Sequence, residues 1–292
     1  MYEKGKRIIS ITVVLVLLSI FTIYHWNNEA VKTAHILPQI PKMNIETLIS
    51  KNKLSNQELE KIAEQTGLQP AAIEDLLSQG RGQVLLELQK AYFAPIELVS
   101  LRTTPLTICE YVINENGEYA KGTSMVNLQD GDILITKNSR FLGWRNGHAG
   151  IVVDAKNGII LEAVMLGTNT RLCSVRDWEK YPSFLVLRLK EEFRDSDSIE
   201  EVVTFAEQNL LDIPYMLHAG LWDRITKKQI KAQEETEAQI VEAALSGTQC
   251  AHVVWYAYEQ IGIDLDSDGG LFVTPYDIQN SPFLEVIQSY GY

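Results

Sequence analysis

Three short apolar runs follow one another between residues 130 and 163, and each is entered through a turn-forming sequence. Asp130-Gly131-Asp132 precedes Ile133-Leu134-Ile135, His148-Ala149-Gly150 precedes Ile151-Val152-Val153, and Lys156-Asn157-Gly158 precedes Ile159-Ile160-Leu161-Glu162-Ala163. Such runs are too short for helices, and β-branched residues next to Gly, Asn and Asp are typical of strands joined by turns. The middle of the chain is therefore expected to form a sheet, which excludes an all-helical fold.

Helical patterns lie on both sides of these strands. Residues 184–189 give a further strand, residues 199–211 have helical periodicity, and Cys250 opens an apolar helix that ends at Gly262. Strands and helices are grouped rather than strictly alternating, so the expected class is α+β.

Charge and cysteine content exclude two other classes of protein. The 292 residues include 26 Lys and Arg against 38 Asp and Glu, a net charge of −12. A surface this acidic repels phosphate backbones, so no nucleic-acid partner is expected. Cys109, Cys173 and Cys250 cannot all pair and have no zinc-motif spacing, so we expect Cys109 and Cys173 to be buried thiols rather than a disulfide.

The N-terminus has the pattern of a membrane anchor. Lys4, Lys6 and Arg7 precede an uncharged apolar run of 17 residues, 8–24, which ends in Tyr24 and is followed by Trp26. Basic residues favour the cytoplasmic side, and aromatic residues favour the membrane interface. We expect residues 1–26 to be an uncleaved single-pass anchor, with a cleaved signal peptide as the alternative. The remainder of the chain is then extracytoplasmic.

The rest of the chain divides into three parts. Residues 27–44, which contain Pro38 and Pro41, are interpreted as a linker. Residues 45–95 have the pattern of a small helical module, beginning with a capping box at Ser55 and Glu58. Residues 98–292 form the expected catalytic domain, and the charged stretch 223–245 within it is expected to be a solvated insertion.

Cys250 is the candidate nucleophile. It follows Gly247-Thr248-Gln249 in the first turn of its helix. Backbone N–H groups and the helix dipole stabilise a thiolate there, and the same N–H groups can stabilise an oxyanion. A cysteine on a helix can also be a small buried hydrophobe, and its place at the helix start is what favours the functional interpretation.

His148 and Glu162 are the candidate partners of that thiol. A nucleophilic cysteine needs an imidazole to exchange protons with it, and His148 begins an apolar strand where a histidine brings no packing advantage. If residues 154–158 form a five-residue loop, Glu162 lies opposite Gly150 and one diagonal step from His148. Gly158 suits such a loop because it can adopt a left-handed conformation. Glu162 would then orient the imidazole.

The order of these motifs resembles a known family. Asp130-Gly131-Asp132-Ile133, Gly147-His148-Ala149-Gly150-Ile151, Leu161-Glu162-Ala163, Ile213-Pro214-Tyr215, Cys250 and Thr274-Pro275 follow one another as in the permuted papain-like amidases, the YaeF/YiiX group related to NlpC-type cell-wall hydrolases. The resemblance covers residues 126–290 and implies a circularly permuted papain-like domain. It also implies Cys250 as nucleophile, His148 as base and Glu162 as orienting residue. The chain departs from the family at Ala251-His252-Val253 and at Met216.

Other residues are weaker candidates. Tyr215, Trp222 and His252 are taken as substrate-binding residues, although core packing explains an aromatic stretch equally well, and His252 should point away from Cys250 on a regular helix. No HxxxH or CxxC spacing supports a metal site, and no cofactor is expected.

Three functions follow from these observations. The first is a membrane-anchored, extracytoplasmic cysteine hydrolase that cleaves an amide bond, with cell-wall peptide as the substrate class that the resemblance implies. The second is an acyltransferase or lipid-ester hydrolase of the lecithin retinol acyltransferase type. The third is a catalytically silent binding module.

Overall fold

The computed structural model describes residues 12–20, 34–141, 143–219, 247–270 and 272–292. Most of the expected anchor, residues 27–33 of the expected linker and the expected insertion at 223–245 lie outside these ranges. Residues 12–20 form a helix. Within the described residues, no helix combines the length and apolarity needed to cross a membrane.

The main element is a six-stranded antiparallel sheet with the order β7-β6-β5-β3-β8-β9. The three apolar runs predicted as strands form its centre, next to the strand predicted at 184–189. The strands are β3 (Ile133–Thr136), β5 (His148–Asp154), β6 (Ile159–Glu162), β7 (Arg171–Ser174), β8 (Phe184–Leu189) and β9 (Leu284–Tyr290).

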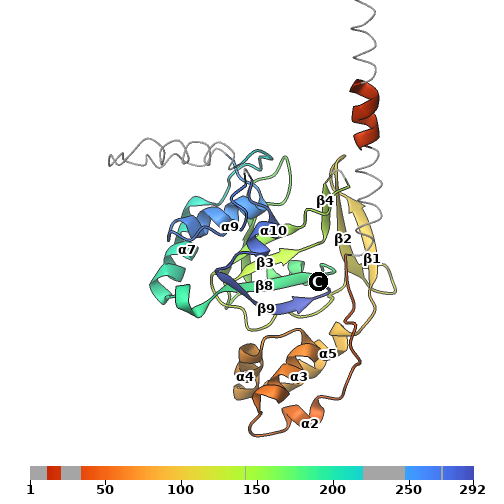
Figure 1. Cartoon of the computed structure of the whole chain (residues 1–292), viewed down its shortest axis with the longest axis vertical. Coiled ribbons are helices and arrows are strands. Elements are labelled where there is room, and N and C mark those ends of the chain that lie inside the picture. Colours follow the sequence, from red (N-terminus) through yellow and green to blue (C-terminus); the bar gives the residue numbers. More distant parts are fainter. Residues whose placement is uncertain (1–11, 21–33, 142, 220–246, 271) are drawn as a thin grey trace, which may run out of the picture.

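A second, three-stranded sheet lies beside the first and has the order β1-β2-β4 (Figure 1). Its strands are β1 (Glu97–Arg102), β2 (Thr107–Ile113) and β4 (Ser139–Phe141), and both pairs are antiparallel. The two sheets with surrounding helices confirm the α+β class.

Helices cover both faces of the six-stranded sheet (Figure 1). On one face, Ile135, Ile151 and Leu187 share a buried cluster with α7 (Ser196–Asn209), α9 (Cys250–Glu259) and α10 (Pro275–Gln279). Side chains alternate between faces along a strand, so Leu134 and Val152 point to the other side. There they pack against residues from the helical segment that precedes the sheets.

That helical segment comprises α2 (Glu46–Ile49), α3 (Asn56–Thr66), α4 (Pro70–Ser78) and α5 (Gly82–Tyr92). The predicted capping box of Ser55 and Glu58 is present, and Gly67 ends α3 with a φ of 72°. The segment is tied to β9 because Gln69 N donates to Ile287 O at 2.9 Å and Ser289 N donates to Gly67 O at 2.8 Å. These helices therefore cover the sheet and share its core. The remaining short elements are α6 (Val175–Trp178) and a 3-10 turn, η1 (Glu191–Phe193).

Candidate active site

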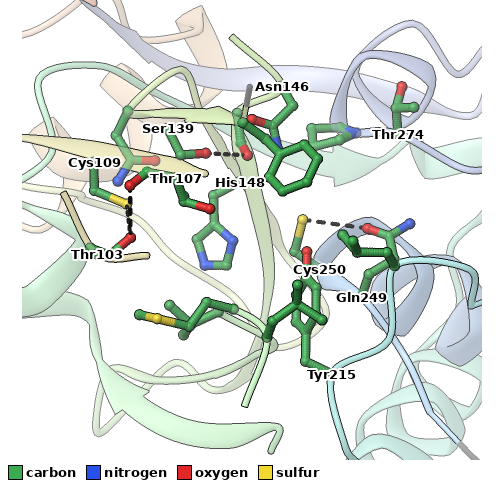
Figure 2. A pocket seen from close by; sticks show the side chains of 18 of the residues that line it. Thr103, Thr107, Cys109, Ser139, Asn146, His148, Tyr215, Gln249, Cys250 and Thr274 are labelled. Carbon is green, nitrogen blue, oxygen red and sulfur yellow. Dashed lines mark hydrogen bonds between the residues drawn. The ribbon is translucent and has the colours of Figure 1, made fainter. Parts of the chain in front are cut away.

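The candidate residues meet at a cavity of about 210 Å³ between the two sheets and the start of α9 (Figure 2). Cys250 and His148 both line it, and so does Tyr215. Most of the other lining residues come from the three-stranded sheet, from the segments after β3 and β6, and from the loop before α10. The full set is Thr103, Thr107, Cys109, Tyr111, Asn138, Ser139, Phe141, Asn146, Gly147, Val164, Met165, Leu166, Tyr181, Leu217, Gln249, Phe272, Val273, Thr274 and Pro275.

Cys250 is the first residue of α9, as predicted. Gln249 is the N-cap, and its side-chain oxygen accepts a hydrogen bond from Ala251 N at 3.1 Å. The preceding residue, Thr248, is held by a short parallel pairing with Tyr215, since Thr248 N donates to Pro214 O at 2.9 Å and Met216 N donates to Thr248 O at 2.7 Å. The segment before the helix is thus fixed, and this fixes the position of the thiol.

The predicted pairing of β5 with β6 is confirmed. Glu162 lies opposite Gly150, and His148 Nε2 and Glu162 Oε2 are 2.8 Å apart. The loop differs from the prediction: it has one residue fewer between the strands, and a bulge between Val152 and Asp154 supplies the missing residue and restores the register. Gly158 has the expected left-handed conformation, with a φ of 66°.

Two glycines allow the histidine to reach this position. Gly147 has a φ of 71°, and a Cβ atom there would lie 2.5 Å from Thr136 O. A Cβ atom on Gly150 would lie 2.8 Å from Cζ2 of Trp178. Both contacts are closer than carbon atoms tolerate, so the hairpin that carries His148 requires glycine at each position.

Glu162 is a buried carboxylate with three donors around it. Its side chain is 1% exposed. Oε2 accepts from His148 and from Trp178 Nε1, the latter at 3.1 Å, and Oε1 accepts from Arg171 at 2.9 and 3.1 Å. Burial alone raises the pKa of Glu162, but His148 and Arg171 outweigh burial and hold this pKa well below its ordinary value. The carboxylate is therefore ionised.

His148 lies between Glu162 and Cys250, where it can exchange a proton with the thiol. Burial lowers the pKa of His148, but interactions with Cys250 and Glu162 outweigh burial and raise it above the ordinary value. Its ring also stacks on Trp178 with centroids 5.0 Å apart. Because Nε2 is engaged by Glu162, Nδ1 is the nitrogen available to the thiol, and Figure 2 shows the ring facing Cys250.

The predicted substrate-binding residues are found in three different situations. Tyr215 lines the cavity, and burial together with the nearby Cys250 raises its pKa. His252 is completely buried, bonds through Nδ1 to Thr248 Oγ1 at 3.0 Å, and is not among the described residues that line the cavity. Two helix positions rotate a side chain by about 200°, which explains why His252 points away from Cys250. Trp222 lies outside the described residues.

The structure also shows the state of the three cysteines and a cluster of acidic side chains. Cys109, Cys173 and Cys250 are free thiols, as expected, although Cys173 is only half-buried. Carboxylate oxygens of Asp266, Asp268 and Asp277 lie within 4.8 Å of one another and could together hold a cation. Asp277 already has a structural role, because it completes the capping box of α10 with Thr274.

No protein-family model, no curated protein and no solved structure matches this chain. A function must therefore be argued from the arrangement of thiol, imidazole and carboxylate.

The sequence patterns did not point to Trp178 and Arg171, which hold Glu162. Arg171 begins strand β7, which pairs with β6 in a register that places Arg171 opposite Glu162. Trp178 lies in α6 and meets Glu162 only through the folding of the chain.

Proposed function

We propose that the protein is a membrane-anchored, extracytoplasmic cysteine hydrolase that cleaves an amide bond, with a permuted papain-like catalytic domain. The observation that carries the proposal is that His148, held at 2.8 Å by the buried carboxylate of Glu162, shares a cavity with a free thiol at the start of a helix. A thiol, a base and a residue that orients the base form the catalytic unit of cysteine hydrolases.

The first half of the reaction forms an acyl-enzyme. Nδ1 of His148 takes the proton of the Cys250 thiol, and the thiolate sulfur attacks the carbonyl carbon of the substrate. A C–S bond forms, and the carbonyl oxygen gains a negative charge that backbone N–H groups at the start of α9 can stabilise. The imidazolium then gives its proton to the amide nitrogen, the C–N bond breaks, and the amine leaves.

The second half of the reaction releases the acid. Water loses a proton to His148 and attacks the thioester carbon, the C–S bond breaks, and the proton returns to the sulfur. Glu162 stays ionised throughout and stabilises the imidazolium, because His148 and Arg171 hold the pKa of this carboxyl low.

Acyl transfer to an acceptor other than water is the second candidate function. It uses the same acyl-enzyme, and the apolar side chains of Val164, Met165 and Leu166 in the cavity lining favour it. Cell-wall peptide remains the substrate class implied by the family resemblance of the sequence.

The membrane anchor is part of the proposal. In the described part of the anchor, residues 12–20, the apolar side chains are exposed, as a lipid-facing helix requires. Protease added on the cytoplasmic side should leave the 27–292 portion intact, and a high-salt wash should leave it membrane-bound. Release of a shortened soluble chain would show that the segment is a cleaved signal.

Hydrolysis of hexanoyl p-nitroanilide tests the proposed chemistry. Cys250→Ala should abolish the release of p-nitroaniline, and His148→Ala should do so nearly as completely. Val286→Ala is the control, because Val286 is 43% exposed on β9 and is not among the described lining residues, so it should retain the wild-type rate. If Cys250→Ala retains the wild-type rate, the proposed nucleophile is wrong. If the wild type releases no product, the silent binding module becomes the better interpretation.

A further inference from the structure

The cavity beside Cys250 is lined by uncharged side chains. None of the lining residues in the described ranges is Asp, Glu, Lys or Arg, and His148, whose pKa is raised, is the one lining residue there that carries a positive charge. A carboxylate or ammonium group on a part of the ligand that lies away from His148 and Cys250 would therefore lose its hydration without gaining an oppositely charged partner from those residues.

Part of the lining of this cavity is apolar and partly open to solvent. Leu166, Leu217 and Phe272 belong to the lining, are 43%, 45% and 42% exposed, and are together called the wall below. Large apolar side chains that remain exposed around a cavity are typical of sites for an apolar ligand. An alkyl chain covering them would remove apolar surface on both partners from water.

We propose that the acyl part of the substrate is an uncharged, apolar chain that lies along the wall formed by Leu166, Leu217 and Phe272. The inference rests on the proposed function, because it places the chain on the acyl side of the bond that Cys250 attacks. The proposal favours an N-acyl amide of lipid type as substrate over a peptide whose acyl side carries carboxylates.

Two bromomethyl ketones of equal length test this preference. In 1-bromooctan-2-one the chain ends in a methyl group, and in 8-bromo-7-oxooctanoate the methyl is replaced by a carboxylate. Both alkylate a thiolate at the same carbon: a C–S bond forms, the C–Br bond breaks and bromide leaves. Rates at Cys250 are measured by peptide mass spectrometry and divided by the rates with 2-mercaptoethanol, which removes the intrinsic reactivity of each ketone.

We expect the neutral ketone to label Cys250 at least about tenfold faster than the carboxylate after this correction, since the charge has no partner along the wall. Shortening the neutral chain should lower the rate by up to about fourfold per methylene group removed from the wall. Equal corrected rates for the two ketones, or rates independent of chain length, would overturn the proposal.

A positive charge introduced at Leu166 should change the preference of Cys250 for the neutral ketone over the carboxylate. Leu166→Lys should reduce the ratio of neutral to charged labelling to about one or reverse it, because the ammonium group can pair with the carboxylate. Leu172→Lys is the matched control: Leu172 is 44% exposed but is not among the described lining residues, so its substitution should leave the ratio unchanged. A ratio that changes equally in both variants would contradict the assignment of the wall.

Labelling and hydrolysis separate this proposal from the proposed function. Hydrolysis of hexanoyl p-nitroanilide with no chain preference in labelling would overturn the apolar acyl site alone. Chain-selective labelling of Cys250 without hydrolysis of that anilide would overturn the hydrolase and leave the cavity preference in place.

Discussion

Substituting Glu162 by Gln should destabilise the protein and slow the proposed hydrolysis, and the burial and partners of Glu162 set the expected loss of stability. The side chains of His148 and Glu162 are 7% and 1% exposed, so water screens their interaction very little. A glutamine oxygen can still accept one of the hydrogen bonds that Glu162 accepts, but its NH₂ group then faces another donor. Losing charge-assisted bonds of this kind costs about 2–3 kcal/mol of unfolding free energy.

Arg171→Gln is the matched control, because it removes a different partner from the same carboxylate. The Arg171 side chain is 59% exposed. An ion pair this open to solvent contributes less than about 1 kcal/mol, so Arg171→Gln should have a much smaller effect on stability. The activity of Glu162→Gln should fall about a hundredfold, since the imidazolium loses the negative charge that stabilises it.

The pH dependence of this effect follows from the directions of the two pKa shifts. The pKa of Glu162 is lowered from 4.5, so its contribution to stability is present above that pH and is lost as the pH falls through the lowered value. The pKa of His148 is raised from 6.5, so its contribution is complete below 6.5 and is lost as the pH rises through the raised value. The difference in unfolding free energy between wild type and Glu162→Gln should therefore be largest between pH 4.5 and pH 6.5, where both contributions are complete.

Urea denaturation of the two variants and the wild type across this pH range measures the effect. If Glu162→Gln and Arg171→Gln destabilise the protein equally, or if the difference does not depend on pH, the buried pair does not have the role assigned to it.

Three further variants test the surroundings of the site. Gly150→Ala should cost about 1–3 kcal/mol in urea denaturation, because its Cβ would lie 2.8 Å from Trp178; unchanged stability would contradict that contact. Trp178→Phe keeps an aromatic ring but removes the N–H donor to Glu162 at 3.1 Å, so it should cost about 1–2 kcal/mol and lower kcat; a wild-type kcat would show that Trp178 is structural only. Arg188→Met should cost about 3–5 kcal/mol, because it leaves the buried carboxylate of Asp132 without its partner at 2.7 Å; a loss below 1 kcal/mol would show that solvent reaches this pair.

The centre of the fold and the placement of His148, Glu162 and Cys250 were predictable because short-range rules govern them. The side-chain period of two along a strand and the turn-forming Gly158 place Glu162 within reach of His148. The start of the helix at Cys250 follows from the change to an apolar helical pattern after Gly247-Thr248-Gln249. The bulge between Val152 and Asp154 was not predictable, because either a longer loop or a bulge gives the same register.

The remaining features depend on contacts between distant parts of the chain. The three-stranded sheet was not predicted in detail, because β1 is exposed at nearly every position and lacks an alternating pattern. The packing of the 45–95 helices on the sheet includes the pairing of Leu68 with Gln288, which lie far apart in the sequence. Trp178 and Glu162 are only 16 residues apart, but their contact depends on how α6 follows β7, and no local sequence rule reports such a contact.

The rate at which iodoacetamide alkylates Cys250, measured against pH in the wild type and in His148→Ala, tests the central claim most directly. If His148 and Cys250 form a thiolate–imidazolium pair, the wild type should react at about pH 6 nearly as fast as at about pH 8, and His148→Ala should lose at least about tenfold of the rate at the lower pH. The rate at which iodoacetamide alkylates 2-mercaptoethanol at each pH serves as the reference for both proteins. Identical pH profiles for Cys250 in the two proteins would contradict the activation of this thiol by His148, and with it the proposed catalytic unit.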